Sequence, residues 1–143
     1  MSNEVEVKAP ADRHGAQWMR FTRIARTDDG GSAFEDGEIE LAGQRVADGV
    51  PAMAVGSVPS TGGVLFLRSA EFDSAPHAAP REQWVVMLRG MIEVTVTDGT
   101  RRRFGPGDLV LATDITGTGH VTAGVGDPPF EALFIPVASG PND

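Results

Sequence analysis

The stretch from His77 to Gly90 combines reactive side chains with an apolar run. Its first side chains carry titratable or hydrogen-bonding groups: His77, Arg81, Glu82 and Gln83. Imidazole transfers protons near neutral pH and also binds divalent metals, and a guanidinium group binds anions. The apolar run that follows ends at Gly90, which is typical of a strand that enters a turn. We therefore expect a reactive site to meet the core in this stretch.

The composition limits the chemistry and the partners of this 143-residue chain. There are no cysteines, so disulfides and thiolate sites are excluded, and any metal must have His, carboxylate or amide ligands. The net charge of -8 argues against nucleic acid as a partner. No apolar run could span a bilayer and the N-terminus lacks a signal-peptide pattern, so we expect no membrane partner and a cytoplasmic protein.

Short apolar runs bounded by Gly and Pro predict an all-β fold. Residues 1–16 are polar and aperiodic, and we expect a flexible N-terminal arm there and one domain over residues 17–143. With 18 Gly and 10 Pro there is little room for long helices, which indicates a sandwich or barrel. Strands are expected within Trp18–Ile24, Val50–Val55, Gly63–Arg68, Trp84–Leu88, Met91–Thr97, Arg103–Ala112, His120–Thr122 and Phe130–Val137.

The clearest local signals follow Met91. Ile92, Val94 and Val96 alternate with polar neighbours, which predicts a strand with one face in a core and the other in water. The dipeptide Asp98-Gly99 then gives the strongest hairpin signal in the chain.

Carboxylates dominate the segment from Asp28 to Asp48, in which Arg45 is the only cation. A carboxylate cluster can bind a hard cation, but the spacing lacks the ligand ladder and the glycine of a calcium loop. We expect a solvated acidic surface in this segment.

Three spaced segments resemble motifs of the cupin superfamily, in particular of small single-domain cupins. They are Asp-Gly-Gly-Ser-Ala-Phe-Glu-Asp at 29–36, His-Ala-Ala-Pro-Arg-Glu-Gln at 77–83 and Asp-Ile-Thr-Gly-Thr-Gly-His at 114–120. The resemblance covers about residues 20–137. It implies a cupin-type double-stranded β-helix, which is a jelly-roll barrel, as a single cupin domain over residues 17–143 with a site in the barrel cavity.

The chain departs from the general cupin pattern at its metal ligands. That pattern supplies two histidines and a carboxylate in the first motif and a third histidine in the second. His77 and His120 occupy two of these positions, whereas Ala79 replaces a histidine and Gln83 replaces the carboxylate. If a metal is bound, the resemblance implies an Fe, Zn, Mn or Ni ion held by His77, Gln83 and His120 in an incomplete ligand set.

Without a metal, the same residues form an acid–base group. His77 and His120 would serve as general acid and base. Arg81 shares strand parity with Gln83, so it can enter the cavity as an anion clamp or form a salt bridge at the rim. Gln83 can polarise a substrate carbonyl or satisfy backbone groups as an interior amide. Asp114 can orient His120 or start a turn, and we favour the turn.

Three functions remain open. The preferred one is an enzyme of the lyase or isomerase type that acts on a small organic molecule by proton transfer, in a cyclisation, isomerisation or dehydration. The alternatives are a metal-dependent dioxygenase and a non-catalytic cupin that binds a small ligand. Because a jelly roll has open edge strands, we expect a homodimer. The apolar cavity wall is expected to comprise Val85, Met87, Val94, Leu109, Leu111 and Phe134.

Overall fold

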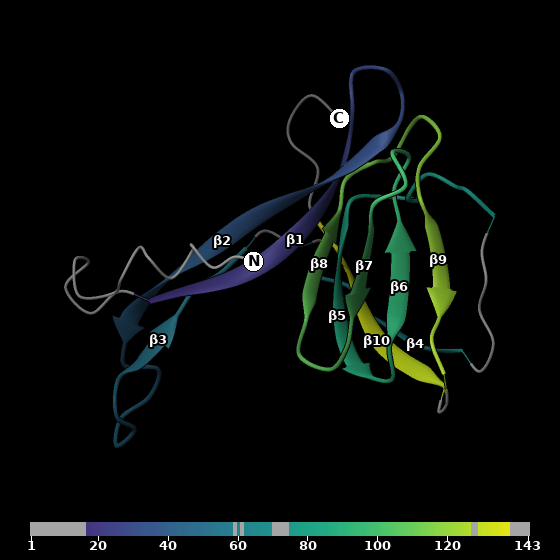
Figure 1. Ribbon diagram of the computed structural model, residues 1–143. Helices are drawn as coiled ribbons and strands as arrows, with labels where there is room; N and C mark the ends of the chain where they lie inside the picture. Colours follow the sequence, from purple (N-terminus) through teal and green to yellow (C-terminus); the bar gives the residue numbers. More distant parts are fainter. Residues whose placement is uncertain (1–16, 59, 61, 70–74, 127–128, 138–143) are drawn as a thin grey trace. The chain divides into compact units, whose positions relative to one another are not determined.

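The computed structural model describes residues 17–58, 60, 62–69, 75–126 and 129–137. Every regular element in these residues is a β-strand (Figure 1). The strands are β1 (Gln17–Arg26), β2 (Ser32–Gln44), β3 (Met53–Val55), β4 (Leu65–Ser69), β5 (Gln83–Arg89), β6 (Ile92–Thr95), β7 (Arg101–Phe104), β8 (Leu109–Ala112), β9 (Val121–Gly124) and β10 (Phe130–Pro136). The all-β prediction is confirmed. Within this described part of the chain, no helix has the length and apolar character needed to cross a membrane.

The chain divides into two compact units. The first comprises Met1–Phe21 and Gly37–Val58, and the second comprises Thr22–Asp36 and Pro59–Asp143. The long strands β1 and β2 each contribute residues to both units. The expected N-terminal arm, residues 1–16, lies outside the described residues, and the expected single domain over 17–143 stays a prediction.

The first unit contains the antiparallel pair of β2 and β3. This ladder aligns Ala42 with Val55 and Gln44 with Met53. Gly37 lies against the ring of Phe21, which an added Cβ atom would overlap. None of the predicted site residues belongs to this unit.

The second unit contains strands of two sheets. In the larger sheet, β1 pairs in parallel with β8, and β8, β5, β10 and β4 follow one another in antiparallel pairs. The smaller sheet is antiparallel with the order β7-β6-β9. Across the described residues neither sheet closes on itself into a barrel. The pairing therefore confirms the all-β class without showing a closed jelly roll.

The hydrophobic core of the second unit draws on both sheets. Met87 and Val94, on β5 and β6, are each only 1% exposed. The predicted alternation on β6 is confirmed, because Ile92 and Val94 are buried whereas Glu93 and Thr95 are half-buried. The cluster comprises Ile24, Met87, Ile92, Val94, Val96, Phe104, Val110, Phe130 and Ala132. Burial of these side chains is the main force that holds the two sheets together.

The predicted hairpin at Asp98-Gly99 joins β6 to β7. The carbonyl of Val96 accepts a hydrogen bond from Gly99 N–H at 2.9 Å, and Val96 N–H donates to the carbonyl of Thr100 at 3.0 Å. Gly99 has a φ of 92°, in the left-handed region that glycine adopts without a Cβ penalty. This pattern is typical of a three-residue loop that ends in a glycine bulge.

The acidic segment contains a strand that the sequence analysis did not predict, the 13-residue β2. Phe34 on this strand packs against the core cluster. The exposed carboxylates of Glu35 and Asp36 pair with Arg23 at 3.3 Å and with Arg102 at 2.9 Å. These side chains are solvated as expected, while the packing of Phe34 and the pairing of the backbone hold the strand in place.

Candidate functional site

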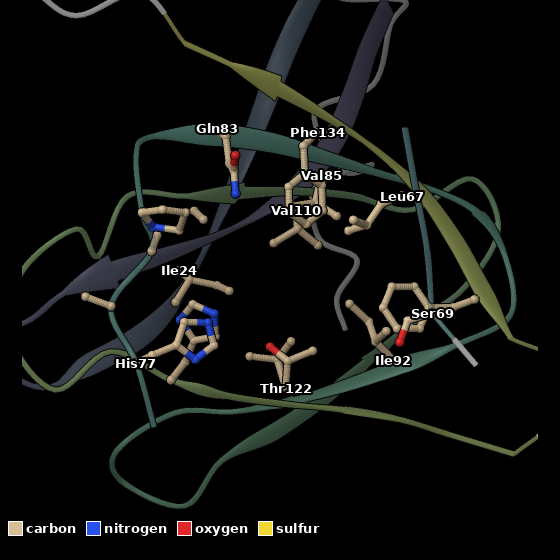
Figure 2. Close-up of a pocket in the computed structure, with 17 residues that line it drawn as sticks. Ile24, Leu67, Ser69, His77, Gln83, Val85, Ile92, Val110, Thr122 and Phe134 are labelled. Atoms are coloured by element: carbon tan, nitrogen blue, oxygen red, sulfur yellow. The ribbon is translucent and has the colours of Figure 1, made fainter. Parts of the chain in front are cut away.

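A cavity in the second unit collects most of the predicted site residues (Figure 2). Its volume is about 480 Å³, which suits a small organic ligand. Among the described residues that line it, the wall is mainly apolar, and the polar side chains are two imidazoles, one amide and two hydroxyls. The lining residues are Ile24, Leu67, Ser69, His77, Ala78, Ala79, Pro80, Gln83, Val85, Ile92, Val94, Val110, Ala112, His120, Thr122, Phe130 and Phe134.

The expected cavity wall is right at three of its six residues. Val85, Val94 and Phe134 line the cavity as predicted, and Met87 lies in the core instead. On β8 the lining residues are Val110 and Ala112, not Leu109 and Leu111. Val110 is opposite Val85 in the register of β5 and β8, so strand pairing decides which side of β8 faces the cavity.

His77 and His120 lie side by side at one end of the cavity. Their backbones form an isolated antiparallel bridge, in which each N–H donates to the other carbonyl at 3.0 Å. The two ring centroids are 5.2 Å apart, with 46° between the ring planes. The structure thus brings together two imidazoles that are far apart in the sequence.

Asp114 holds the ring of His120. Nδ1 of His120 donates to Oδ2 of Asp114 at 2.6 Å, and both side chains are buried. Because a carboxylate oxygen only accepts, this contact places the ring proton on Nδ1 and leaves Nε2 as an acceptor in the neutral ring. The preference for Asp114 as a simple turn residue is wrong, since it orients the histidine.

A backbone carbonyl sets the orientation of the second ring. Nδ1 of His77 lies 3.0 Å from the carbonyl oxygen of Ala75, which can only accept. His77 is exposed whereas His120 is 7% exposed. Both neutral rings therefore present Nε2 as an acceptor, and His77 also has access to solvent.

Arg81 does not line the cavity. Its exposed side chain lies beside the start of β5, where Nη1 donates to Oε1 of Gln83 at 3.0 Å. Gln83 itself lines the cavity and is 3% exposed. The structure therefore joins His77, Gln83 and His120 in one site and does not bring Arg81 into it as a clamp. Among the described residues, Arg81 makes this hydrogen bond to an amide, and the salt bridge expected at the rim stays a prediction.

The three motif segments meet beside the two histidines. Thr118 N–H donates to the carbonyl of Gly30 at 2.8 Å, and the Ser32 hydroxyl donates to the carbonyl of Gly119 at 2.7 Å. Gly119 has a φ of 78°, and an added Cβ atom would overlap the carbonyl oxygen of His77. Glycine at this position is thus required for the close approach that forms the histidine bridge.

The donor set of the cavity does not fit a tightly held divalent metal ion. Among the residues that the structure describes, no group of three or more His, Asp or Glu side chains could hold an ion. The amide oxygen of Gln83 already accepts from Arg81, which leaves the imidazoles of His77 and His120 as donors. Zinc sites in proteins normally use at least three protein ligands. The metal ion implied by the cupin resemblance stays a prediction that these contacts do not support.

Comparisons with known proteins leave the family open. No family model matches the chain, and no curated protein matches it. One similar solved structure is a conserved protein of unknown function from Streptococcus pyogenes, with 16% identity and a TM-score of 0.37. The match covers 58% of this chain and 81% of that protein. At this TM-score the likeness carries no argument, so the resemblance to cupins also stays a prediction.

Proposed function

We propose that this protein is an enzyme of the cupin jelly-roll type that transfers protons on a small organic molecule. The observation that carries the proposal is the buried Asp114–His120 pair beside His77, at one end of an apolar cavity. Buried acid–base pairs in such a cavity are typical of catalytic sites.

His120 is the proposed general base. Its Nδ1–H is held by Asp114, so Nε2 accepts the substrate proton. The positive charge that develops on the ring is stabilised by the Asp114 carboxylate, which is 0% exposed and acts at low local dielectric.

His77 is the proposed general acid. It is exposed and therefore exchanges protons with water, while its backbone is fixed to that of His120. A proton taken up at Nε2 can be delivered to a substrate oxygen at the same end of the cavity. Proton removal by one ring and delivery by the other support an isomerisation, a cyclisation or a dehydration.

A non-catalytic protein that binds a small ligand is the second candidate. The mainly apolar wall favours it, because Val85, Val110 and Phe134 can bury a hydrocarbon ligand without any reaction (Figure 2). This candidate requires saturable binding with no product. The metal-dependent dioxygenase has less support, since the cavity has two imidazole donors and no carboxylate among the described residues that line it.

The elimination of 5-nitrobenzisoxazole tests the proposed base directly. In this reaction a base removes the ring C–H proton, the N–O bond breaks, and a coloured cyanonitrophenolate forms. We expect the wild-type protein to catalyse it and the His120→Ala variant to lose a factor of about 100 in kcat/KM, which is typical for a general base. His77→Ala should retain more of this activity, because the leaving phenolate does not require protonation.

The matched control is His14→Ala, which removes the third histidine of the chain. We expect this variant to keep the wild-type rate, with near-ultraviolet circular dichroism confirming that each variant is folded. Equal rates for the wild type and His120→Ala would contradict the proposed function and would favour the ligand-binding candidate.

A further inference from the structure

We infer that the cavity selects a neutral, enolisable carbonyl compound, and that Arg81 sets this preference by fixing the orientation of the Gln83 amide. This inference rests on the proposed function, because it names the ligand class of the same site. Arg81 is then a positioning residue that acts through Gln83 from outside the cavity.

The contact with Arg81 determines which end of the Gln83 amide faces the ligand. A guanidinium group has donors and no acceptor, so the atom that it contacts at 3.0 Å must be the amide oxygen. The amide nitrogen is therefore the other end, and Figure 2 shows it pointing into the cavity. Gln83, at 3% exposure, thus presents N–H donors to a buried ligand.

The two imidazoles offer hydrogen-bond acceptors to the ligand, whereas the Gln83 amide offers donors. Because Nδ1 of His120 donates to Asp114 and Nδ1 of His77 donates to the Ala75 carbonyl, each neutral ring offers Nε2 as an acceptor. The cavity therefore combines a donor on Gln83 with acceptors on the histidines. A carbonyl oxygen suits the amide donor, and an acidic C–H group on the adjacent carbon suits an imidazole base.

The lack of charged side chains among the described lining residues limits the class of ligand further. The described residues that line the cavity include no Asp, Glu, Lys or Arg. A carboxylate or phosphate ligand would therefore lose its hydration without gaining an ion pair, which is unfavourable. The apolar side chains around the rest of the wall suit a hydrocarbon body, so the ligand class is a neutral carbonyl compound with an apolar skeleton.

The polar groups of the wall supply the base and the donor that enolisation of such a ligand requires. His120 Nε2 takes the proton from the carbon beside the carbonyl, and the C–H electron pair forms the carbon–carbon double bond of the enolate. The carbonyl π electrons move to the oxygen, whose negative charge is stabilised by the Gln83 N–H. Return of the proton to the same or to another carbon completes an exchange or an isomerisation without any further reactant.

Binding of three bicyclic probes tests the ligand class. They are 2-tetralone, the hydrocarbon tetralin and the anion 2-naphthoate, each titrated into the full-length protein by calorimetry. We expect 2-tetralone to bind about fivefold or more tightly than tetralin, because one net hydrogen bond changes the affinity by about this factor. We expect 2-naphthoate to bind no more tightly than tetralin. Equal affinities for 2-tetralone and tetralin, or a preference for 2-naphthoate, would overturn the inference.

The ratio of the 2-tetralone and tetralin affinities tests the proposed roles of Gln83 and Arg81. Gln83→Leu should bring the ratio to one, since it removes the donor and retains an apolar side chain. Arg81→Met should lower the ratio because the amide can then rotate, whereas Arg81→Lys retains a donor and should preserve it. If Arg81 had a merely structural role, Arg81→Met would weaken the binding of both probes equally. An unchanged ratio in Arg81→Met would therefore overturn the positioning role.

Deuterium exchange separates this inference from the proposed function. In D2O, the wild type should exchange the proton beside the 2-tetralone carbonyl faster than buffer does, and His120→Ala should abolish the excess rate, as followed by proton NMR. A Gln83-dependent preference for 2-tetralone without exchange would uphold the ligand class and contradict the proposed catalysis. Exchange with no dependence of binding on Gln83 would uphold the catalysis and overturn the ligand class.

Discussion

The fully buried carboxylate of Asp114 shows how the fold of one loop gives a side chain its role. Asp114 and His120 are six residues apart, a spacing that is equally typical of a turn. They meet because the loop between them folds back, and the Asp114 carbonyl accepts from Ala79 N–H at 3.0 Å. The same contact places Ala79 in the cavity wall. The small side chain of Ala79 and the amide of Gln83 therefore both belong to the wall that a ligand would contact.

Asp29 gives a prediction for the pH dependence of stability. The Thr27 hydroxyl and, to a smaller extent, the Gly31 N–H donate to its carboxylate and hold the pKa of Asp29 below the ordinary value of 3.8. A lowered folded-state pKa means that the carboxylate adds stability above about pH 3.8 and that this contribution disappears as the pH falls through the lower value. Because Asp29 is fully exposed, the effect should be small.

Asp29→Asn should therefore unfold at a slightly lower temperature than the wild type near neutral pH. The difference should vanish in strong acid, where both side chains are neutral. Thermal unfolding of the two proteins over a pH series measures this difference. A constant difference at every pH would mean that the charge on Asp29 has no part in the stability of this turn.

The loops, more than the strands, assemble the site. The loop between β8 and β9 contacts the β1–β2 turn through Thr118 and Gly30, and it contacts the segment before β5 through the bridge of His77 and His120. These contacts join residues that are widely separated in the sequence. The segments 29–36, 77–83 and 114–120 thus form one connected structural feature.

Gly119 is the position in this loop where a substitution should be most harmful. An alanine at a φ of 78° is strained, and its Cβ atom would also overlap the His77 carbonyl. Gly107 is a matched control, since it has a φ of 90° and no atom within 4 Å of an added Cβ. Gly107→Ala should cost about 1 to 2 kcal/mol of stability, and Gly119→Ala should cost clearly more.

Urea unfolding measures both changes, and the activity assay with 5-nitrobenzisoxazole provides a second comparison. The Gly119→Ala protein should lose activity because His77 and His120 are forced apart, whereas Gly107→Ala should retain it. Equal losses of stability in the two variants would show that the close approach at Gly119 is not important for the fold.

At the scale of the molecule, the two sheets of the second unit share one core, and the cavity occupies part of it. Ile92, Val94, Val110 and Phe130 belong both to the core cluster and to the cavity wall. The packing that stabilises the unit therefore also shapes the ligand site.

On β4, the last strand of the larger sheet, Phe66 is 75% exposed. The homodimer expected from the sequence stays a prediction, which sedimentation can test.

Met87 should be a strong determinant of stability. It is 1% exposed at the centre of the core cluster, and its neighbour Leu88 on the same strand is 45% exposed. Met87→Ala should lower the free energy of unfolding by about 2 to 5 kcal/mol, because it leaves a cavity in a packed core. Leu88→Ala removes a side chain of similar size from the exposed face and should cost much less. Chemical denaturation of both variants makes the comparison, and similar losses would contradict the assigned facing of β5.

The sequence alone determined the features that depend on near neighbours. Alternation located β6, turn chemistry located the hairpin at Gly99, and glycines and prolines bounded most other strands. The motif resemblance also selected His77, Gln83 and His120, all of which line the cavity. These signals are local because they reflect the conformational preferences of a few consecutive residues.

The tertiary structure decided the features that depend on distant partners. Four consecutive apolar residues on β8 have no alternation, so only their pairing with β5 selects Val110 and Ala112 for the cavity. β2 was missed because its acidic composition hides a strand that the hairpin with β1 and the packing of Phe34 stabilise. The bridge between His77 and His120 likewise depends on how the chain folds back. Composition and spacing contain little information about such contacts, because hydrogen bonds and burial arise between surfaces that meet only in the folded chain.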